Sequence, residues 1–234
     1  MHLARALTAS LAMALLAGSA SEAATAKNVR AGTDWTRTFS VTPQGGFRMG
    51  NPKAKLAVVE YGSLTCPHCR HFAETGVKPL VDRYVRTGKA SYEFRSFVLN
   101  GIDLSATLVA RCSGPTRFFP IAEQLYATQP VWSGKVEQLP QDQQEKLGAL
   151  PQGEMMLAIA KVSGLLPVAA AHGVPVAKSQ ACLKDEAASM RLVKMNQAAN
   201  AVGVHGTPIF FVNGKQVSAY DWETLQPFLK EAGG

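Results

Sequence analysis

The chain has 234 residues, of which 24 are Lys or Arg and 17 are Asp or Glu, so its formal charge is +7. The basic residues are scattered and are not interleaved with aromatic ones, so the sequence gives little support for nucleic-acid binding. Hydrophobic residues make up 47% of the chain and charged residues 18%, which excludes a largely disordered protein.

The first 26 residues have the pattern of a secretory signal peptide. His2 and Arg5 precede an almost wholly small or apolar stretch at 6–17, and small residues follow up to Ala26. This stretch is shorter than the roughly 20 residues of a membrane-spanning helix, so a retained anchor is the weaker alternative. We expect residues 1–26 to be removed during export, and residues 27–36 to form a flexible segment before the fold.

The next elements in the chain predict a β-α-β unit preceded by a hairpin. Residues 39–49 have the pattern of a short hairpin, 56–62 of a buried strand, 69–86 of a helix bent near Gly76 and Pro79, and 90–98 of a second strand. Units of this kind join two parallel strands by a right-handed crossover. The carboxyl end of the first strand is where ligands usually bind in open sheets.

Cys66-Pro67-His68-Cys69 lies between that strand and that helix. Two thiols at this spacing can close a disulfide reversibly. A helix start places the first sulfur beside unpaired N–H groups and the positive end of the helix dipole, which favours the reactive thiolate. The alternatives are half a zinc site or a static bridge, but zinc normally needs four ligands and the sequence has no second C-x-x-C or Cys/His cluster.

Strand patterns disappear between residues 101 and 185. Helical patterns replace them at 104–112, 118–127, 143–147, 155–162 and 176–183. After a further helix at 185–201, two strands at 209–212 and 215–217 flank the hairpin signal Asn213-Gly214, and a helix at 221–230 closes the chain. We therefore predict a helical insertion between two halves of one sheet, covering one face of it. A freestanding helical domain is the alternative.

The chain has four cysteines, an even number that permits two disulfides in an exported protein. Pairing Cys66 with Cys69 leaves Cys112 and Cys182, which lie near the two ends of the insertion. A bridge between them would pin the insertion closed. The alternative is a pair of buried free thiols.

Gly206-Thr207-Pro208 stands directly before the strand at 209–212, where a proline must occupy the first position or an edge. The order β-α-β, C-P-H-C, helical insertion and V-x-G-T-P-x-F-F-V-N-G closely resembles the bacterial thiol–disulfide interchange family typified by DsbA, over residues 37–231. The resemblance implies an α/β thioredoxin fold, a central mixed sheet flanked by helices with an inserted all-helical subdomain. Its first half would be 37–100, the insertion 101–185 and the second half 186–234.

The resemblance also implies roles for single residues. Thr207–Pro208 would be a cis peptide bond packed against the C-x-x-C, with Pro67, Thr207, Pro208 and His205 lining the substrate site. Cys66 would be the nucleophile and Cys69 the resolving cysteine, with His68 stabilising the thiolate. Glu60, a carboxyl group in a buried strand, aligns with the family's acidic residue that exchanges a proton with Cys69; pairing with Lys55 at a strand edge is the alternative.

These observations predict a periplasmic, monomeric thiol–disulfide oxidoreductase that donates its Cys66–Cys69 disulfide to exported cysteine-containing polypeptides. A DsbB-like membrane oxidase that passes electrons to quinone would regenerate it, and no metal or organic cofactor would be needed. The alternative on the same fold is an isomerase or reductase kept reduced by a membrane electron donor, because such members often carry Thr before this proline. A periplasmic holdase without redox chemistry is the alternative from another class.

Overall fold

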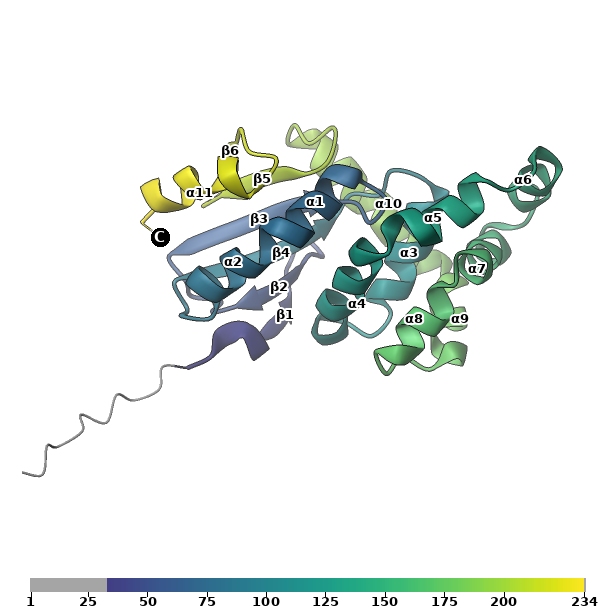
Figure 1. Cartoon of the computed structure of the whole chain (residues 1–234), viewed down its shortest axis with the longest axis horizontal. Coiled ribbons are helices and arrows are strands. Elements are labelled where there is room, and N and C mark those ends of the chain that lie inside the picture. The colour runs from purple at the N-terminus through teal and green to yellow at the C-terminus, as the bar shows by residue number, and fades with distance from the viewer. Residues whose placement is uncertain (1–32, 234) are drawn as a thin grey trace, which may run out of the picture. The chain divides into compact units, whose positions relative to one another are not determined.

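The computed structural model describes residues 33–233, in which six strands form one mixed sheet (Figure 1). The strand order is β1-β2-β4-β3-β5-β6. The strands are β1 (Phe39–Val41), β2 (Phe47–Gly50), β3 (Leu56–Gly62), β4 (Ala90–Ser96), β5 (Ile209–Val212) and β6 (Lys215–Val217).

Helices account for most of the remaining described residues. They are the 3₁₀ helix η1 (Trp35–Arg37), α1 (Pro67–Thr75), α2 (Val77–Leu80), the π-helical turn η2 (Val81–Val85), α3 (Gly101–Arg111), α4 (Pro115–Ala127), α5 (Gln129–Glu137), α6 (Gln141–Gly148), α7 (Gln152–Ser163), α8 (Leu165–Ala171), α9 (Val176–Leu183), α10 (Glu186–Ala201) and α11 (Trp222–Glu231).

The β-α-β unit is confirmed. β3 and β4 are parallel, with Leu56 opposite Ala90 and Gly62 opposite Ser96, and α1, α2 and η2 connect them. The two hairpins complete the sheet, because β2 pairs antiparallel with β4 and β5 pairs antiparallel with β3. Asn213 and Gly214 form the turn between β5 and β6 with positive φ angles of 50° and 80°, as a two-residue hairpin requires. The predicted fold class is therefore correct.

Two layers of helix cover the sheet. On one face, Phe72 and Leu80 from α1 and α2 and Leu225 from α11 share a core with Val58 and Phe210. On the other face, Ala199 of α10 packs in a cluster with Val59, Tyr61 and Phe97. The sheet is thus buried on both sides around β3, which runs through its interior.

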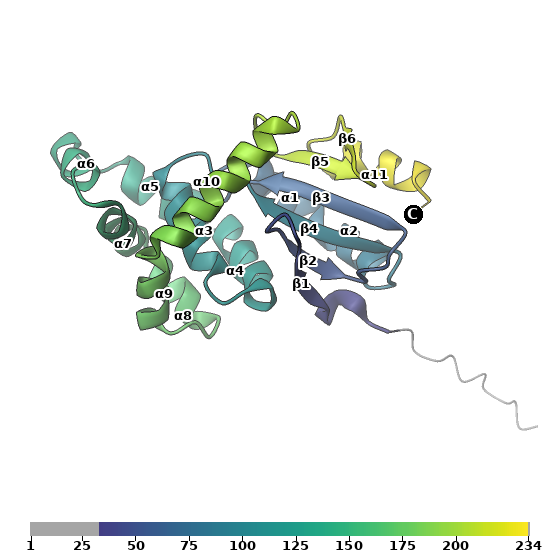
Figure 2. The same ribbon diagram turned by 180° about the vertical axis from the view of Figure 1, so that it is seen from behind.

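The helical insertion, α3 to α9, lies past the carboxyl ends of β3 and β4 (Figures 1 and 2). The expectation that it covers one face of the sheet is largely wrong, because α4 is the insertion helix that packs against β1 and β2, while the others pack mainly on one another. The insertion has its own core, which includes Phe118, Ile121, Met156 and Leu165. That core continues to Cys66 and Cys69, and the described residues form one compact unit with no freestanding helical domain among them.

Several boundaries differ from the sequence-based expectation. The helix expected at 69–86 begins at Pro67, two residues earlier, whereas the bend expected near Gly76 is confirmed by the break between α1 and α2. Helices α5 and α8 were not predicted. The proline in the first turn of α5 resembles a break in the sequence, although a helix accepts proline there. Helix α8 is apolar almost throughout, so its sequence has no helical period.

The end of the segment 27–36 is ordered, contrary to expectation. Asp34 caps η1 and forms an ion pair with Arg86 at 2.8 Å, and the N–H of Trp35 donates to the carbonyl of Arg86. The rest of this segment, 27–32, and the expected signal peptide lie outside the described residues. Within 33–233 no single helix is long and apolar enough to cross a membrane, although the bent pair α7 and α8 reaches that length and composition together.

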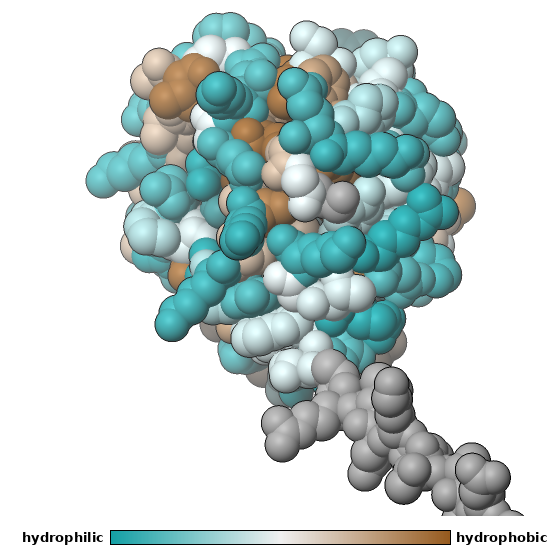
Figure 3. Space-filling model, turned by 90° about the vertical axis from the view of Figure 1, so that its left-hand side faces the viewer, coloured by the Kyte–Doolittle hydropathy of each residue, from teal (hydrophilic) through white to brown (hydrophobic). Residues whose placement is uncertain are grey.

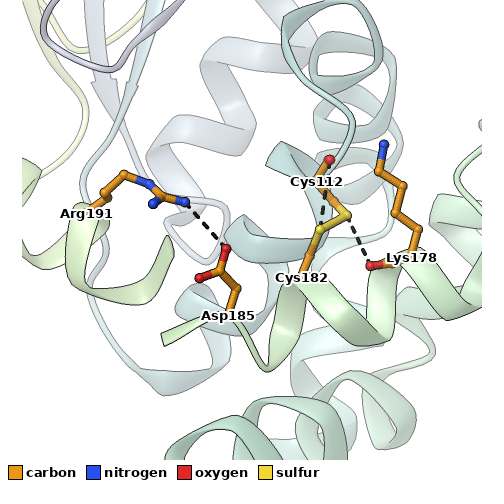
Figure 4. The surroundings of a disulfide bond; sticks show 5 residues. All are labelled: Cys112, Lys178, Cys182, Asp185 and Arg191. Atoms are coloured by element: carbon orange, nitrogen blue, oxygen red, sulfur yellow. Dashed lines mark hydrogen bonds and ion pairs between the residues drawn. A yellow bond between two sulfur atoms is a disulfide. The ribbon is translucent and has the colours of Figure 1, made fainter. Parts of the chain in front are cut away.

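The end of the sheet remote from the insertion carries mostly hydrophilic side chains, with hydrophobic ones gathered in small areas between them (Figure 3). Within the insertion, a disulfide joins Cys112, directly after α3, to Cys182 in α9 (Figure 4). The two residues are 70 positions apart, and an ion pair between Arg191 and Asp185 lies close by. The bridge therefore ties the first helix of the insertion to its last.

We expect the double variant Cys112→Ala/Cys182→Ala to lose about 4 kcal/mol of unfolding free energy, because the bridge restricts a long loop in the unfolded chain. Urea unfolding of the variant and of the unmodified protein measures this, with Cys66 and Cys69 in the same redox state in both. A loss below about 1 kcal/mol would show that the bridge contributes little to stability.

Candidate active site

Cys66 is the N-cap of α1 and ends the short loop that follows β3. Its Sγ accepts a hydrogen bond from the N–H of Cys69 at 3.4 Å, and its thiol donates to the carbonyl oxygen of Thr207 at 3.3 Å. Pro67 follows in the first helical position, where its fixed φ suits the helix and its missing N–H costs nothing. The sequence Cys-Pro thus starts a helix with a sulfur in the place of a capping oxygen.

Hydrogen bonds to the sulfur lower the pKa of Cys66 from its ordinary 9.0 to about 5. The Cys69 side chain makes the largest contribution, and the Thr207 side chain and the N–H groups of Cys69 and His68 add to it, while partial burial opposes them. These donors compensate the negative charge of the thiolate, so the reactive form of Cys66 is favoured at neutral pH.

Cys69 is in the opposite situation. Its side chain is 0% exposed, and burial raises its pKa well above the ordinary value. The hydrogen bond to Cys66 and the nearby charge of Glu60 act in the same direction. One dithiol therefore combines a sulfur that readily ionises with one that holds its proton.

Glu60 lies in the interior strand β3 and is 1% exposed. Its carboxyl group accepts a hydrogen bond from the Tyr92 hydroxyl on β4, and burial raises its pKa to about 8 in spite of that bond. The alternative partner Lys55 is exposed and β3 is no edge strand, so the expected edge pairing is wrong. Glu60 also lines a pocket of about 480 Å³ between the sheet, α1, α2 and α4, with Tyr92 and Tyr126 in its walls.

The loop before β5 forms the opposite wall of the site. The Thr207–Pro208 peptide bond is cis, and Pro208 is buried. The Thr207 carbonyl accepts a hydrogen bond from the Cys66 thiol at 3.3 Å, and the Thr207 side chain helps to lower the pKa of Cys66. The structure thus joins residues that lie 141 positions apart in the chain.

The two candidate histidines lie at the margin of this arrangement. His68 and Pro67 are exposed, and the His68 contribution to the sulfur comes from its backbone N–H. The His205 ring is exposed and lies 3.3 Å from the side-chain oxygen of Asn200 near the end of α10, and among the described residues it has no hydrogen bond to the dithiol.

Four buried side chains near the dithiol were not found in the sequence: Tyr92, Asp103, Tyr126 and Gln129. For Tyr92 the signal was present, since the parallel register puts Phe94 opposite Glu60 and Tyr92 two residues earlier on the same face. The other three come from the insertion, and no spacing in the sequence relates them to Cys66. Among residues 33–233, no group of three or more His, Cys, Asp or Glu side chains is placed to hold a metal ion.

Comparisons with known proteins agree with this geometry. A family model described as thioredoxin matches residues 42–231. The crystal structure of a protein-disulfide isomerase from Novosphingobium aromaticivorans is 32% identical, with a TM-score of 0.74 over 80% of this chain and 97% of that one. Wolbachia pipientis alpha-DsbA1 is 21% identical, with a TM-score of 0.65 over 82% of this chain and 92% of that one, and so shares the fold.

Among curated proteins, one from Rickettsia conorii named "Putative protein-disulfide oxidoreductase" is 30% identical over 188 residues. The alignment covers 79% of this chain, which spans 59% of the length of that relative. The chain therefore belongs to the thioredoxin family, and its fold is the DsbA-like form in which a helical segment is inserted into the sheet.

Proposed function

We propose that the protein is a thiol–disulfide oxidoreductase that donates a Cys66–Cys69 disulfide to exported cysteine-containing polypeptides. The observation that carries this proposal is the contrast within the dithiol, where the pKa of Cys66 is lowered to about 5 and that of Cys69 is raised. The names of the Novosphingobium and Rickettsia relatives support the same reaction class.

The reaction begins with the Cys66–Cys69 disulfide. A substrate thiolate attacks Cys66 Sγ, the bond to Cys69 breaks, and a mixed disulfide forms between the substrate and Cys66. Cys69 leaves with the electron pair and takes up a proton, which Glu60 can supply because a carboxyl group with a pKa of about 8 is largely protonated at neutral pH. A second substrate thiolate then attacks the substrate sulfur, and Cys66 leaves as a thiolate while the substrate disulfide forms.

The low pKa of Cys66 favours electron flow from substrate to protein. Each pH unit by which the thiolate is favoured stabilises the reduced protein by about 1.4 kcal/mol. For a two-electron couple this corresponds to roughly 30 mV. A strongly stabilised thiolate therefore makes the disulfide an oxidant, which supports donation to substrates over reduction of them.

The substrate would bind beside Cys66 along the loop that holds Thr207 and Pro208. The Thr207 backbone can pair with an extended chain as an added strand, with Pro67 and His205 at the margin. The signal-peptide pattern and the Cys112–Cys182 bridge support a periplasmic location, because disulfides persist in oxidising compartments. A DsbB-like membrane oxidase that passes electrons to quinone would reoxidise the monomeric enzyme, with the dithiol as the redox centre and no cofactor.

A second candidate is an isomerase or reductase kept reduced by a membrane donor. Two observations favour it, namely Thr207 before the cis proline and the description of the Novosphingobium structure as a protein-disulfide isomerase.

Equilibration with a glutathione buffer distinguishes a disulfide donor from a reductase. We expect a reduction potential nearer to the roughly −120 mV of a strong oxidant than to the roughly −270 mV of a reductant. The Cys66→Ser variant is the control and should neither equilibrate nor oxidise a reduced unfolded substrate. A potential near the lower value supports the second candidate, whereas a Cys66→Ser variant that still protects unfolded chains in full supports a holdase.

The stability of the reduced protein should depend on pH through Cys66. The pKa of this thiol is lower in the folded protein, at about 5, than its ordinary value of 9.0. Its contribution is therefore complete above pH 9 and is lost as the pH falls through about 5. Urea unfolding of the reduced protein and of reduced Cys66→Ser between these pH values should give curves that diverge as the pH rises, and parallel curves would contradict the lowered pKa.

The Glu60→Gln variant should slow thiol–disulfide exchange at neutral pH, because glutamine cannot supply a proton to Cys69. A positioned acid–base group increases a reaction rate by about 100-fold or more. We expect the rate of exchange to fall by up to about 100-fold in Glu60→Gln. Stopped-flow measurement of substrate oxidation tests this. The control is Glu93→Gln, a buried carboxyl on the neighbouring strand that binds Thr42 and Arg95 instead. An unchanged rate and an unchanged potential in Glu60→Gln would exclude the proton relay.

A further inference from the structure

The four residues between β3 and α1, Ser63 to Cys66, form the redox loop of this protein. Three side chains of the helical insertion bind its backbone. The Tyr126 hydroxyl of α4 donates to the Ser63 carbonyl at 3.0 Å. The Gln129 amide of α5 donates to the carbonyls of Leu64 at 2.8 Å and Cys66 at 3.0 Å.

The third side chain is Asp103 of α3, which accepts the N–H of Leu64 at 3.0 Å. Its second oxygen accepts the N–H of Leu99 at 2.9 Å, so Asp103 also holds the loop that follows β4. Burial raises the pKa of Asp103 to about 6, so the group is largely ionised at neutral pH and can accept both bonds. Both peptide groups of Leu64 are thus bonded to insertion side chains.

These bonds are protected from water. Asp103 is 0% exposed, and Tyr126 and Gln129 are each 4% exposed. A buried backbone group that loses its hydrogen-bond partner is destabilised, so each of these bonds favours one backbone conformation. The side chains of Leu64 and Cys66 are themselves buried in the core of the insertion.

The position of the Cys66 sulfur follows from this backbone. The Cys66 carbonyl accepts the N–H of Arg70 at 3.1 Å, as the start of α1 requires, and the Gln129 amide binds the same oxygen. Fixing this peptide group restrains the ψ angle of the N-cap, and the hydrogen bond from the Cys66 N–H to the Ser63 carbonyl at 3.2 Å restrains its φ angle. These angles decide whether Sγ lies opposite the N–H of Cys69 and beside Thr207.

We propose that Asp103, Tyr126 and Gln129 are positioning residues that hold the redox loop in the geometry that stabilises the Cys66 thiolate. None of the three has a hydrogen bond to the sulfur, and each acts through the backbone of the redox loop. In this view the insertion determines how oxidising the dithiol is. The importance of this for catalysis rests on the proposed function, but the effect on Cys66 itself does not.

The test uses three variants of the full protein, each of which changes one of the three positioning side chains. Gln129→Met keeps the length of the side chain and loses the two hydrogen-bond donors. Tyr126→Phe loses the hydroxyl group. Asp103→Asn places an amide donor opposite the N–H of either Leu64 or Leu99, which Asp103 accepts in the unmodified protein. We expect the midpoint of the Cys66 thiolate titration, followed by ultraviolet absorbance, to rise by about one pH unit in Gln129→Met and by less in Tyr126→Phe. The equilibrium constant for oxidation of glutathione should fall about tenfold, which equals about 30 mV.

A matched control is Gln144→Met. The Gln144 amide also donates to two backbone carbonyls, those of Leu139 at 2.8 Å and Glu137 at 3.4 Å, at the junction of α5 and α6. Circular dichroism and urea unfolding establish that each variant is folded. If the other variants unfold, Tyr126→Phe still tests the proposal, because it loses a single oxygen atom. We expect Gln144→Met to leave the titration midpoint unchanged.

Two outcomes would overturn the proposal. The first is an unchanged Cys66 midpoint in folded Gln129→Met and Tyr126→Phe, and the second is an equal rise in Gln144→Met. The thiolate titration requires no substrate, so it reports on the positioning residues alone. Failure of the proposed function is a separate result, in which the unmodified protein does not oxidise a reduced polypeptide although its Cys66 titrates at low pH.

Discussion

The hydrogen bond from the N–H of Cys69 to the sulfur of Cys66 links the chemistry of this protein to the formation of a helix. A capping group at a helix start normally satisfies backbone donors and does nothing else. Here the capping atom is also the reactive one. Any contact that fixes the start of α1 therefore also affects the stability of the Cys66 thiolate. The parallel pair β3 and β4 fixes it from one side, the cis-proline loop from another and the insertion helices from a third.

Burial then separates the groups that this bond brings together. Cys66 has several hydrogen-bond donors at its sulfur, whereas Cys69 and Glu60 lie deeper, where the neutral form is favoured. The same low-dielectric surroundings therefore lower one pKa through directed donors and raise two others through loss of solvent. The positions of these groups on β3 and α1, and not their residue types alone, produce the difference.

The sequence predicted the features that depend on neighbouring residues. Cys66-Pro67-His68-Cys69, Thr207-Pro208 and Asn213-Gly214 each carry a local constraint, and the strands around them alternate or run apolar in readable ways. The contacts of Tyr126 and Gln129 could not be predicted, because these residues bind backbone groups 63 and 65 positions earlier and no periodicity marks them. Likewise, the position of the insertion could not be predicted, and it was wrongly expected to cover one face of the sheet. The pattern of a run of helices does not show which of its faces meets the rest of the chain.

The reactive sulfur and the loop that completes its surroundings are separated by 141 residues. Protein chains are made from the amino end, so Cys66 and Cys69 emerge well before Thr207 and Pro208. The donors at the start of α1 can form early from local sequence, whereas the wall of the site contributed by the loop before β5 requires a further 141 residues. The protein's full reactivity is therefore acquired only when that loop has been made, and a shorter nascent chain carries a weaker version of its own active site.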